Sequence, residues 1–120
     1  MPFMFENLDV YQKSVDFADD VVVLTAEFPA GYRFLVDQLN RAALSIAANL
    51  AEGNGRFTKP DRRNFFYIAR GSAQECVPLM EIARRRGLIQ EPAAVELKGR
   101  LEIIAKMISG LNNGLENRER

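Results

Sequence analysis

A stripe of polar side chains at helical spacing is the most informative chemical feature of this 120-residue sequence. Residues three and four apart lie on one side of a helix, and here an apolar stripe runs about 120° around the same helix. Amide, hydroxyl and small side chains suit close approach by another chain and a fixed hydrogen-bond network. We expect Arg41 and Glu52 to join such a network, largely buried, within or between subunits. The polar stripe consists of Gln38, Arg41, Ser45, Asn49 and Glu52.

Metal and catalytic chemistry have few suitable residues in this chain. Glu52 and Glu75 could meet as the carboxylate pair of a bundle metal site, or each could pair with an arginine such as Arg41 or Arg70. The chain has no histidine and one cysteine, which removes Ser-His-Asp triads, Cys-His pairs and Cys-rich zinc sites. We expect Cys76 to be a small buried hydrophobe. The prediction is a protein that is not an enzyme and has no catalytic, cofactor or metal site.

Basic side chains gather after residue 53 in a chain whose net charge is zero. Residues 54–70 have a net charge of +4, whereas residues 1–30 have a net charge of −5. Arg63, Tyr67 and Arg70 fall on one outward helix face, and arginines beside a tyrosine can hold phosphate and stack on bases. The alternative is a solvated face, with Arg70 bonded inside an oligomer. The nucleic-acid candidates are Arg56, Lys59, Arg62, Arg63 and Arg70, whereas Arg84, Arg85 and Arg86 are interpreted as charges that favour a helix C-terminus.

Four helices must position these groups. Apolar residues at helical spacing predict helices over residues 8–27, 32–52, 58–86 and 92–115, joined by short links. Helices of about 20 residues with short connections pack as an antiparallel, up-down-up-down four-helix bundle, which is an all-α fold. We expect one domain over residues 1–120, in which residues 116–120 form a frayed tail.

Glycine, threonine and proline mark where these helices begin, stop or bend. Gly53-Asn54-Gly55 is predicted to end the second helix through the left-handed conformation that glycine accepts, and Gly87 to end the third. Thr58 caps the start of the third helix, and Pro78 inside it predicts a kink around residues 74–78 without a break. The inner face of the third helix is expected to comprise Phe65, Ile68, Ala69, Ser72, Ala73, Cys76, Leu79, Met80 and Ala83.

The first helix carries more apolar surface than a bundle core needs. Its apolar arc spans roughly 200°, about twice the width that a surface helix of a monomer buries. Part of the excess is expected to pack against a second subunit; alternatively, Phe3 and Phe5 of the N-terminal segment cover it. The fourth helix has instead a narrow seam at the 3.5-residue spacing of helical bundles, formed by Leu97, Leu101, Ile104, Ile108, Leu111 and Leu115.

The expected location is the cytoplasm. No apolar run approaches the length of a membrane-spanning helix, and the N-terminal residues lack the basic lead of a secretory signal. A single cysteine suits a reducing compartment. We therefore expect a cytoplasmic protein that does not enter a membrane.

The segment from Gln38 to Arg56, QLNRAALSIAANLAEGNGR, also carries a family signature. It resembles that of the bacterial four-helix-bundle proteins encoded in intervening sequences of 23S ribosomal RNA genes, which reads Gln-Leu-x-Arg-Ala, Ser-Ile, Asn-Ile-Ala-Glu-Gly and Gly-Arg. Pro78 departs from the family pattern. The resemblance extends to Phe5-Glu6, Val10 to Lys13, Phe28-Pro29, Ile68 to Ser72 and Glu75.

This resemblance implies a homo-oligomer, specifically a pentamer, without recognised catalytic residues. A relative that serves as an accessory protein of diversity-generating retroelements is strongly basic and binds nucleic acid and a reverse transcriptase. This chain has zero net charge, and affinity for a phosphate backbone comes mainly from basic side chains. Two functions stay open. One is a non-enzymatic oligomeric scaffold that binds a protein partner, and the other is a nucleic-acid-binding ring that assists a reverse transcriptase or acts on structured RNA.

Overall fold

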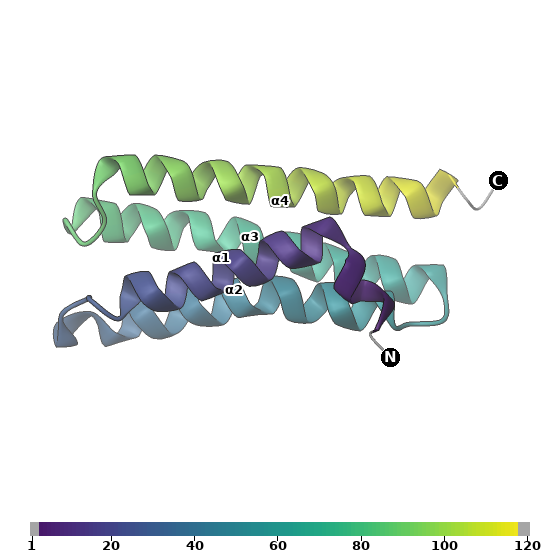
Figure 1. Ribbon diagram of the computed structural model, residues 1–120, viewed down its shortest axis with the longest axis horizontal. Helices are drawn as coiled ribbons and strands as arrows, with labels where there is room; N and C mark the ends of the chain where they lie inside the picture. The colour runs from purple at the N-terminus through teal and green to yellow at the C-terminus, as the bar shows by residue number, and fades with distance from the viewer. Residues whose placement is uncertain (1–2, 118–120) are drawn as a thin grey trace.

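The chain is helical throughout the part that the structure describes. The computed structural model describes residues 3–117 and contains no strand among them (Figure 1). Each long helix begins and ends within two residues of its predicted boundaries. The elements are the short 3-10 helices η1 (Met4–Asn7) and η2 (Ala30–Tyr32) and the helices α1 (Asp9–Thr25), α2 (Arg33–Asn54), α3 (Lys59–Arg85) and α4 (Glu91–Asn117).

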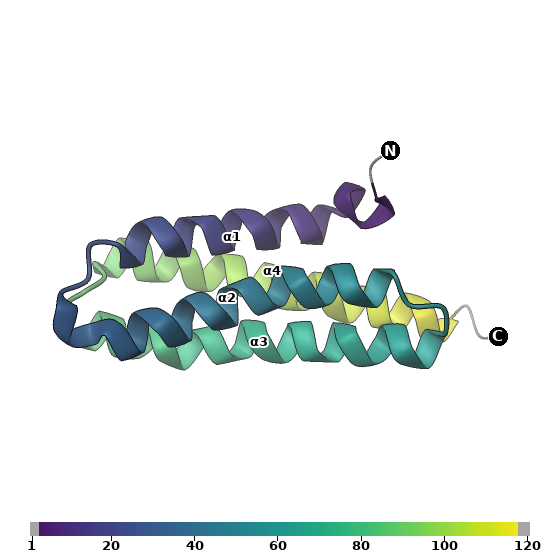
Figure 2. The same ribbon diagram turned by 90° about the horizontal axis from the view of Figure 1, so that it is seen from below.

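Successive helices run antiparallel, which confirms the predicted up-down-up-down bundle (Figure 1, Figure 2). α2 lies between α1 and α3, and α4 returns from α3 to lie beside α1. The backbones of α1 and α3 do not approach each other closely, so the two helices occupy diagonally opposite corners of the bundle. The outward face of α1 and the outward face of α3 therefore point in different directions.

The core consists of the apolar stripes that the sequence predicted. Leu35, Leu39, Ile46 and Leu50 of α2 are at most 1% exposed, because their spacing turns all of them toward the bundle axis. The seam of α4 is likewise buried, apart from the half-buried Leu111. These stripes meet those of α1 and α3 in one contiguous cluster of apolar side chains.

The ends of α3 follow the predicted signals. The Thr58 hydroxyl accepts a hydrogen bond from the Asp61 backbone N–H at 3.3 Å and so caps the first turn. Gly87 adopts φ +75°, and the N–H of Leu88 donates to the Ala83 carbonyl at 2.9 Å. The bond from Leu88 occupies a carbonyl that the helix end would otherwise leave without a partner. Between the two ends, α3 continues without a break through Pro78.

The expected reason for the glycines at the end of α2 is wrong. α2 continues through Asn54, Gly55 has φ −87°, and Gly87 is the one described residue with a positive φ. Gly53 is instead a buried helical residue at which a Cβ atom would lie 2.8 Å from Cε1 of Phe66. The residue is needed for close helix packing and not for a left-handed turn.

Two further expectations need correction. Phe66 is the core aromatic of α3, at 3% exposure, whereas Phe65 is half-buried and Ile68 is 43% exposed. The close approach at Gly53 admits the Phe66 ring, and the buried period continues from it through Ala69 and Ala73. α4 extends to Asn117, and residues 118–120 of the predicted frayed tail lie outside the described residues.

Candidate functional site

The polar stripe of α2 has an inner half that binds α3. Asn49 Nδ2 donates to the Ser45 hydroxyl at 2.9 Å and to the Ser45 carbonyl at 2.8 Å. The Ser72 hydroxyl of α3 lies 2.8 Å from the Ser45 hydroxyl, and Ser72 is buried. Small hydroxyl groups therefore let α2 and α3 approach closely while their polar atoms stay hydrogen-bonded. This part of the predicted network exists within one protomer.

The outer half of the stripe faces solvent in the isolated protomer. Gln38, Arg41 and Glu52 are exposed, as is Glu75 on α3. Glu52 pairs with an arginine, Arg56, at 2.6 Å and one helical turn away. Within residues 3–117, Arg41 has no ion-pair partner. The protomer alone thus gives Arg41 and Glu52 no buried network.

The predicted basic cluster is partly used inside the bundle. Arg70 Nε donates to the Ser109 hydroxyl at 2.9 Å and so joins α3 to α4. Arg62 is half-buried, and its Nη2 donates to the Asn54 amide oxygen at 3.4 Å. Arg63 is also half-buried and is not without a partner. Of the three residues predicted to form an outward face, only Tyr67 is exposed, at 54%, whereas Arg63 and Arg70 are half-buried.

An aromatic residue at the α2–α3 turn was missed. Phe57 is fully exposed, beside Arg56, whose guanidinium lies 4.6 Å from the Phe65 ring centroid. A hollow of about 310 Å³ next to Phe57 is lined by Ala51, Glu52 and Gly55. The sequence did offer a signal for Phe57, because it is an apolar residue in a turn and belongs to no helical apolar stripe. An exposed aromatic beside a cation can stack on a base or anchor in a partner's pocket.

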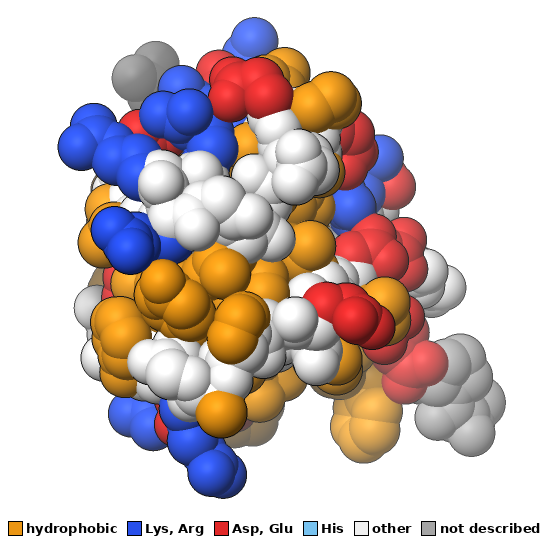
Figure 3. Space-filling view, turned by 90° about the vertical axis from the view of Figure 1, so that its left-hand side faces the viewer, with side chains coloured by type: hydrophobic (Ala, Val, Ile, Leu, Met, Phe, Trp, Pro, Cys, Tyr) orange, Lys and Arg blue, Asp and Glu red, His pale blue; other side chains and the backbone are white. Residues whose placement is uncertain are grey.

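At the opposite end, ion pairs hold the arginines of α3. Arg84 bonds the two carboxylate oxygens of Glu81 at 3.0 and 2.8 Å and reaches Glu91 of α4 at 3.2 Å. The bonds from Arg84 and then Arg85 hold the pKa of Glu81 at about 2. Figure 3 shows an apolar centre at this end, with basic side chains at its upper left and lower edge and acidic side chains toward its right. The predicted charges are in the last turn, and Arg84 also fastens α3 to α4.

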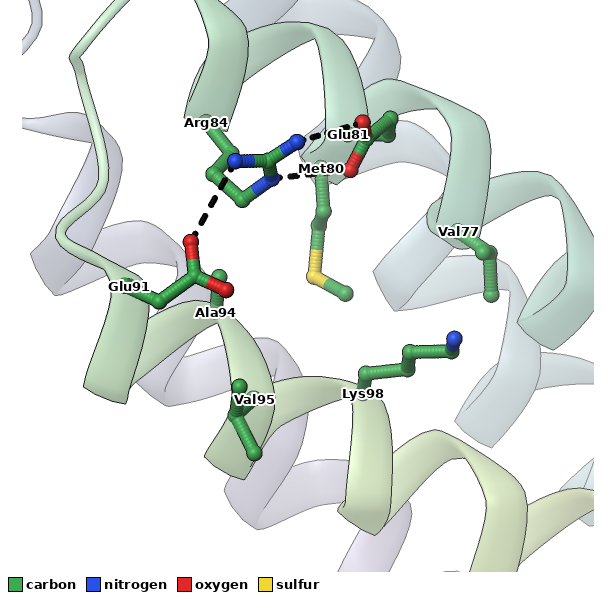
Figure 4. A pocket seen from close by; sticks show the side chains of 8 residues that line it. All are labelled: Val77, Met80, Glu81, Arg84, Glu91, Ala94, Val95 and Lys98. Carbon is green, nitrogen blue, oxygen red and sulfur yellow. Dashed lines mark hydrogen bonds and ion pairs between the residues drawn. The ribbon is translucent and has the colours of Figure 1, made fainter.

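A groove of about 470 Å³ separates α3 from α4 near this end (Figure 4). The buried side chain of Met80 lies at its floor, and the rim includes Val95, which is 62% exposed. Lys98 extends into the opening from α4. The sequence did not predict this groove, because it depends on the register between two helices. Its lining residues are Val77, Met80, Glu81, Arg84, Glu91, Ala94, Val95 and Lys98.

The excess apolar arc of α1 remains largely uncovered. Val15, Val22 and Val23 are 39%, 57% and 65% exposed. Phe5 packs edge-on against Tyr11 near the start of the helix, with ring centroids 5.0 Å apart. Phe3, which stacks on Phe5, is itself 69% exposed. The N-terminal aromatics therefore cover the beginning of α1 and leave Val15, Val22 and Val23 exposed.

Reactive groups are scarce in the described chain. Burial, followed by the nearby charge of Glu75, raises the pKa of Cys76 to about 12, so its thiol stays protonated at neutral pH. No group of three or more possible metal-ligand side chains occurs among residues 3–117. In the same part of the chain, no helix is both long and apolar enough to cross a membrane.

Similarity to known proteins supports the assignment of the fold. The chain resembles the crystal structure of a protein with unknown function from the S23 ribosomal protein family of Bacteroides thetaiotaomicron. The TM-score is 0.77 at 24% sequence identity, over 86% of this chain and 97% of the other. No curated protein sequence matches this chain. A family model matches residues 6–110, and the chain therefore belongs to the family of the 23S rRNA-intervening sequence protein.

Proposed function

We propose that this protein is a non-enzymatic homo-oligomeric scaffold that binds a protein partner in the cytoplasm. The observation that carries the proposal is the uncovered face of α1 with its exposed valines Val15, Val22 and Val23. Leu44 on the neighbouring helix α2 is also 64% exposed. Monomeric proteins rarely leave contiguous apolar surface open to water, so a second copy is the simplest cover.

The proposed oligomer is a pentamer, as resemblance to the family implies. Light scattering at micromolar concentration tests it, because the chain has a mass of 13.5 kDa. The expected result is a mass several times that value, unchanged on moderate dilution. A mass of one chain would reject the oligomer and leave the exposed valines without an explanation.

The partner of the scaffold is proposed to be a protein because the surface is mixed in charge and several helices expose apolar residues. Ile103 on α4 and Phe34 on α2 are 53% and 63% exposed. A pull-down from native cells, with and without nuclease treatment, separates the candidates. A protein retained in fixed proportion after nuclease treatment supports the scaffold. Material lost with the nucleic acid supports the second candidate.

The second candidate is a nucleic-acid-binding ring that assists a reverse transcriptase or acts on structured RNA. The observation that favours it is Phe57, fully exposed beside Arg56 and close in sequence to Lys59. A single protomer offers few basic contacts, but a ring repeats them, and linked sites gain avidity. Neutralised phosphates release counterions, so this binding would weaken steeply with salt.

Fluorescence anisotropy with structured RNA and with duplex DNA tests this candidate, from about 50 to about 200 mM salt. The most direct variants are Phe57→Ala and the pair Arg56→Glu with Lys59→Glu. Arg62 and Arg63 are less suitable, because both have interaction partners, whereas Lys59, which is also half-buried, has no ion-pair partner among residues 3–117. Loss of salt-dependent binding in these variants at unchanged helix content supports a nucleic-acid site. No salt-dependent binding by the intact protein at tens of micromolar rejects it.

A further inference from the structure

We propose that the outward face of α1 in one copy docks into the α3–α4 groove of the next copy, with Asp19 of the first against Lys98 of the second. The inference rests on the proposed homo-oligomer and names the two surfaces that would form it. Both surfaces are exposed and have apolar parts, and each holds a charge that has no ion-pair partner among residues 3–117. The two charges have opposite signs.

The receiving surface is the groove shown in Figure 4. Its floor is Met80, an adaptable side chain that fills irregular apolar contacts, and Val95 widens its apolar rim. Arg84 at one end is already bonded to Glu81 and Glu91. Lys98 has no carboxylate partner among residues 3–117, although its ammonium extends over the groove.

The inserting surface is an acidic residue set among exposed valines. Asp19 lies four residues after Val15 and three and four residues before Val22 and Val23, so all four share one side of α1. All three valines are at least 39% exposed. Within the described chain Asp19 has no ion-pair partner, whereas the next residue, Asp20, bonds Arg100 at 2.7 Å.

The two surfaces complement each other in apolar character and in charge. An amphipathic helix that enters a groove between two helices makes contacts at intervals of three and four residues, which is the spacing of Asp19 and its valines. Apolar contact around the pair would exclude water, and Asp19 would meet the one groove cation that has no partner. Charge pairs of this kind fix the register and choice of partner.

The placement of the surfaces permits repeated contact. α1 and α3 lie at opposite corners of the bundle, so a copy cannot fill its own groove with its own α1 face. Every copy presents both surfaces, and a contact between unlike surfaces generates a closed ring when the rotation closes. The same geometry fits the proposed homo-oligomer without requiring another protein.

Charge reversal tests the pair by light scattering. Asp19→Lys and Lys98→Asp should each raise the dissociation constant of the oligomer by about tenfold or more, because each places like charges together. The double variant exchanges the charges and should restore the oligomer. Asp37→Lys and Lys106→Asp are matched controls at exposed positions on α2 and α4, and they should leave the mass unchanged.

A disulfide trap gives a second measurement that does not depend on weakened assembly. The variant with Asp19→Cys and Lys98→Cys should form a ladder of covalent oligomers under an added oxidant, because each copy contributes to two contacts. Cys76 is fully buried and should not contribute. The variant with Asp37→Cys and Lys106→Cys should remain uncross-linked.

These outcomes separate the docking from the proposed function. An oligomeric parent whose single charge variants keep full mass, or whose cysteine variant gives no ladder, overturns the docking and leaves the scaffold standing. Dissociation of the single variants without rescue in the double variant overturns the pairing of Asp19 with Lys98. A monomeric parent protein overturns both the docking and the oligomer.

Discussion

Gly53 is the residue at which the bundle tolerates least change. A Cβ atom there would lie 2.8 Å from Phe66 Cε1 and 3.0 Å from Phe65 Cβ, closer than packed carbon atoms allow. Gly53→Ala should therefore destabilise the fold by about 1–3 kcal/mol, because the Phe66 ring must move within a packed core. Thermal unfolding followed by circular dichroism should show Tm lower by several degrees.

Gly71 provides the matched control for this substitution. It also lies inside a long helix, but a Cβ atom added there meets nothing within 4 Å. Gly71→Ala should be stabilising by about 0.5–1 kcal/mol, since alanine loses less backbone entropy than glycine in a helix. Equal effects of the two substitutions would show that the contact with Phe66 does not constrain Gly53.

Local signals at single residues were readable from the sequence, whereas contacts between helices were not. Thr58 and Gly87 act on backbone groups a few residues away, so their roles follow from spacing. The partner of Arg70 is Ser109, 39 residues later, and depends on the register of α3 against α4. Gly53 was recognised as special, but its neighbour Phe66 lies across a helix interface and could not be identified.

At the level of elements, the ion pairs of Glu81 join the last turns of α3 to the start of α4 through Arg84. The pKa of Glu81 is about 2, against an ordinary value of 4.5. A depressed carboxyl pKa stabilises the fold above the unfolded value, and this stabilisation is lost as pH falls from about 4.5 toward 2. Glu81→Gln should therefore lower Tm at neutral pH and have no effect near pH 2.

The expected difference in Tm is small, roughly a few degrees at most, because the pair is accessible to solvent and salt. Glu102→Gln on α4 is a suitable control, since that side chain is exposed and should show no such pH dependence. A difference between parent and Glu81→Gln that stays constant from pH 7 to about pH 2 would contradict the role of this carboxylate.

The helices themselves were predictable because burial follows their period. The stripes of α2 and α4 point to one side, and the bundle buries that side. α3 was less predictable near its start, where three aromatic residues follow one another and only Phe66 is buried. The groove beside Met80 arises from how α3 and α4 align, which a pattern along one helix does not encode.

At the scale of the whole molecule, the net charge is zero, but acidic and basic residues are concentrated in different helices. α1 is acidic and carries Asp19 among valines, whereas α3 carries a surplus of arginine. Two of those arginines already have partners inside the protomer: Arg70 bonds Ser109, and Arg84 bonds Glu81. The surfaces left for the proposed contacts between copies are therefore chiefly the outer faces of α1 and α2 and the α3–α4 groove.

Substitutions in the outer half of the α2 stripe test whether the segment with the family signature takes part in contacts between subunits. Within one protomer, Arg41 is exposed, and Glu52 forms an exposed ion pair with Arg56, one helical turn away. Such a pair contributes only about 0.3–0.5 kcal/mol to the stability of the fold. Arg41→Ala and Glu52→Ala should thus leave helix content intact, but they should dissociate the oligomer if the stripe lies between subunits. Sedimentation velocity with circular dichroism measures both properties, and Lys106→Ala at an exposed position on α4 is the control. Unchanged sedimentation of both variants would mean that the outer stripe is ordinary solvated surface.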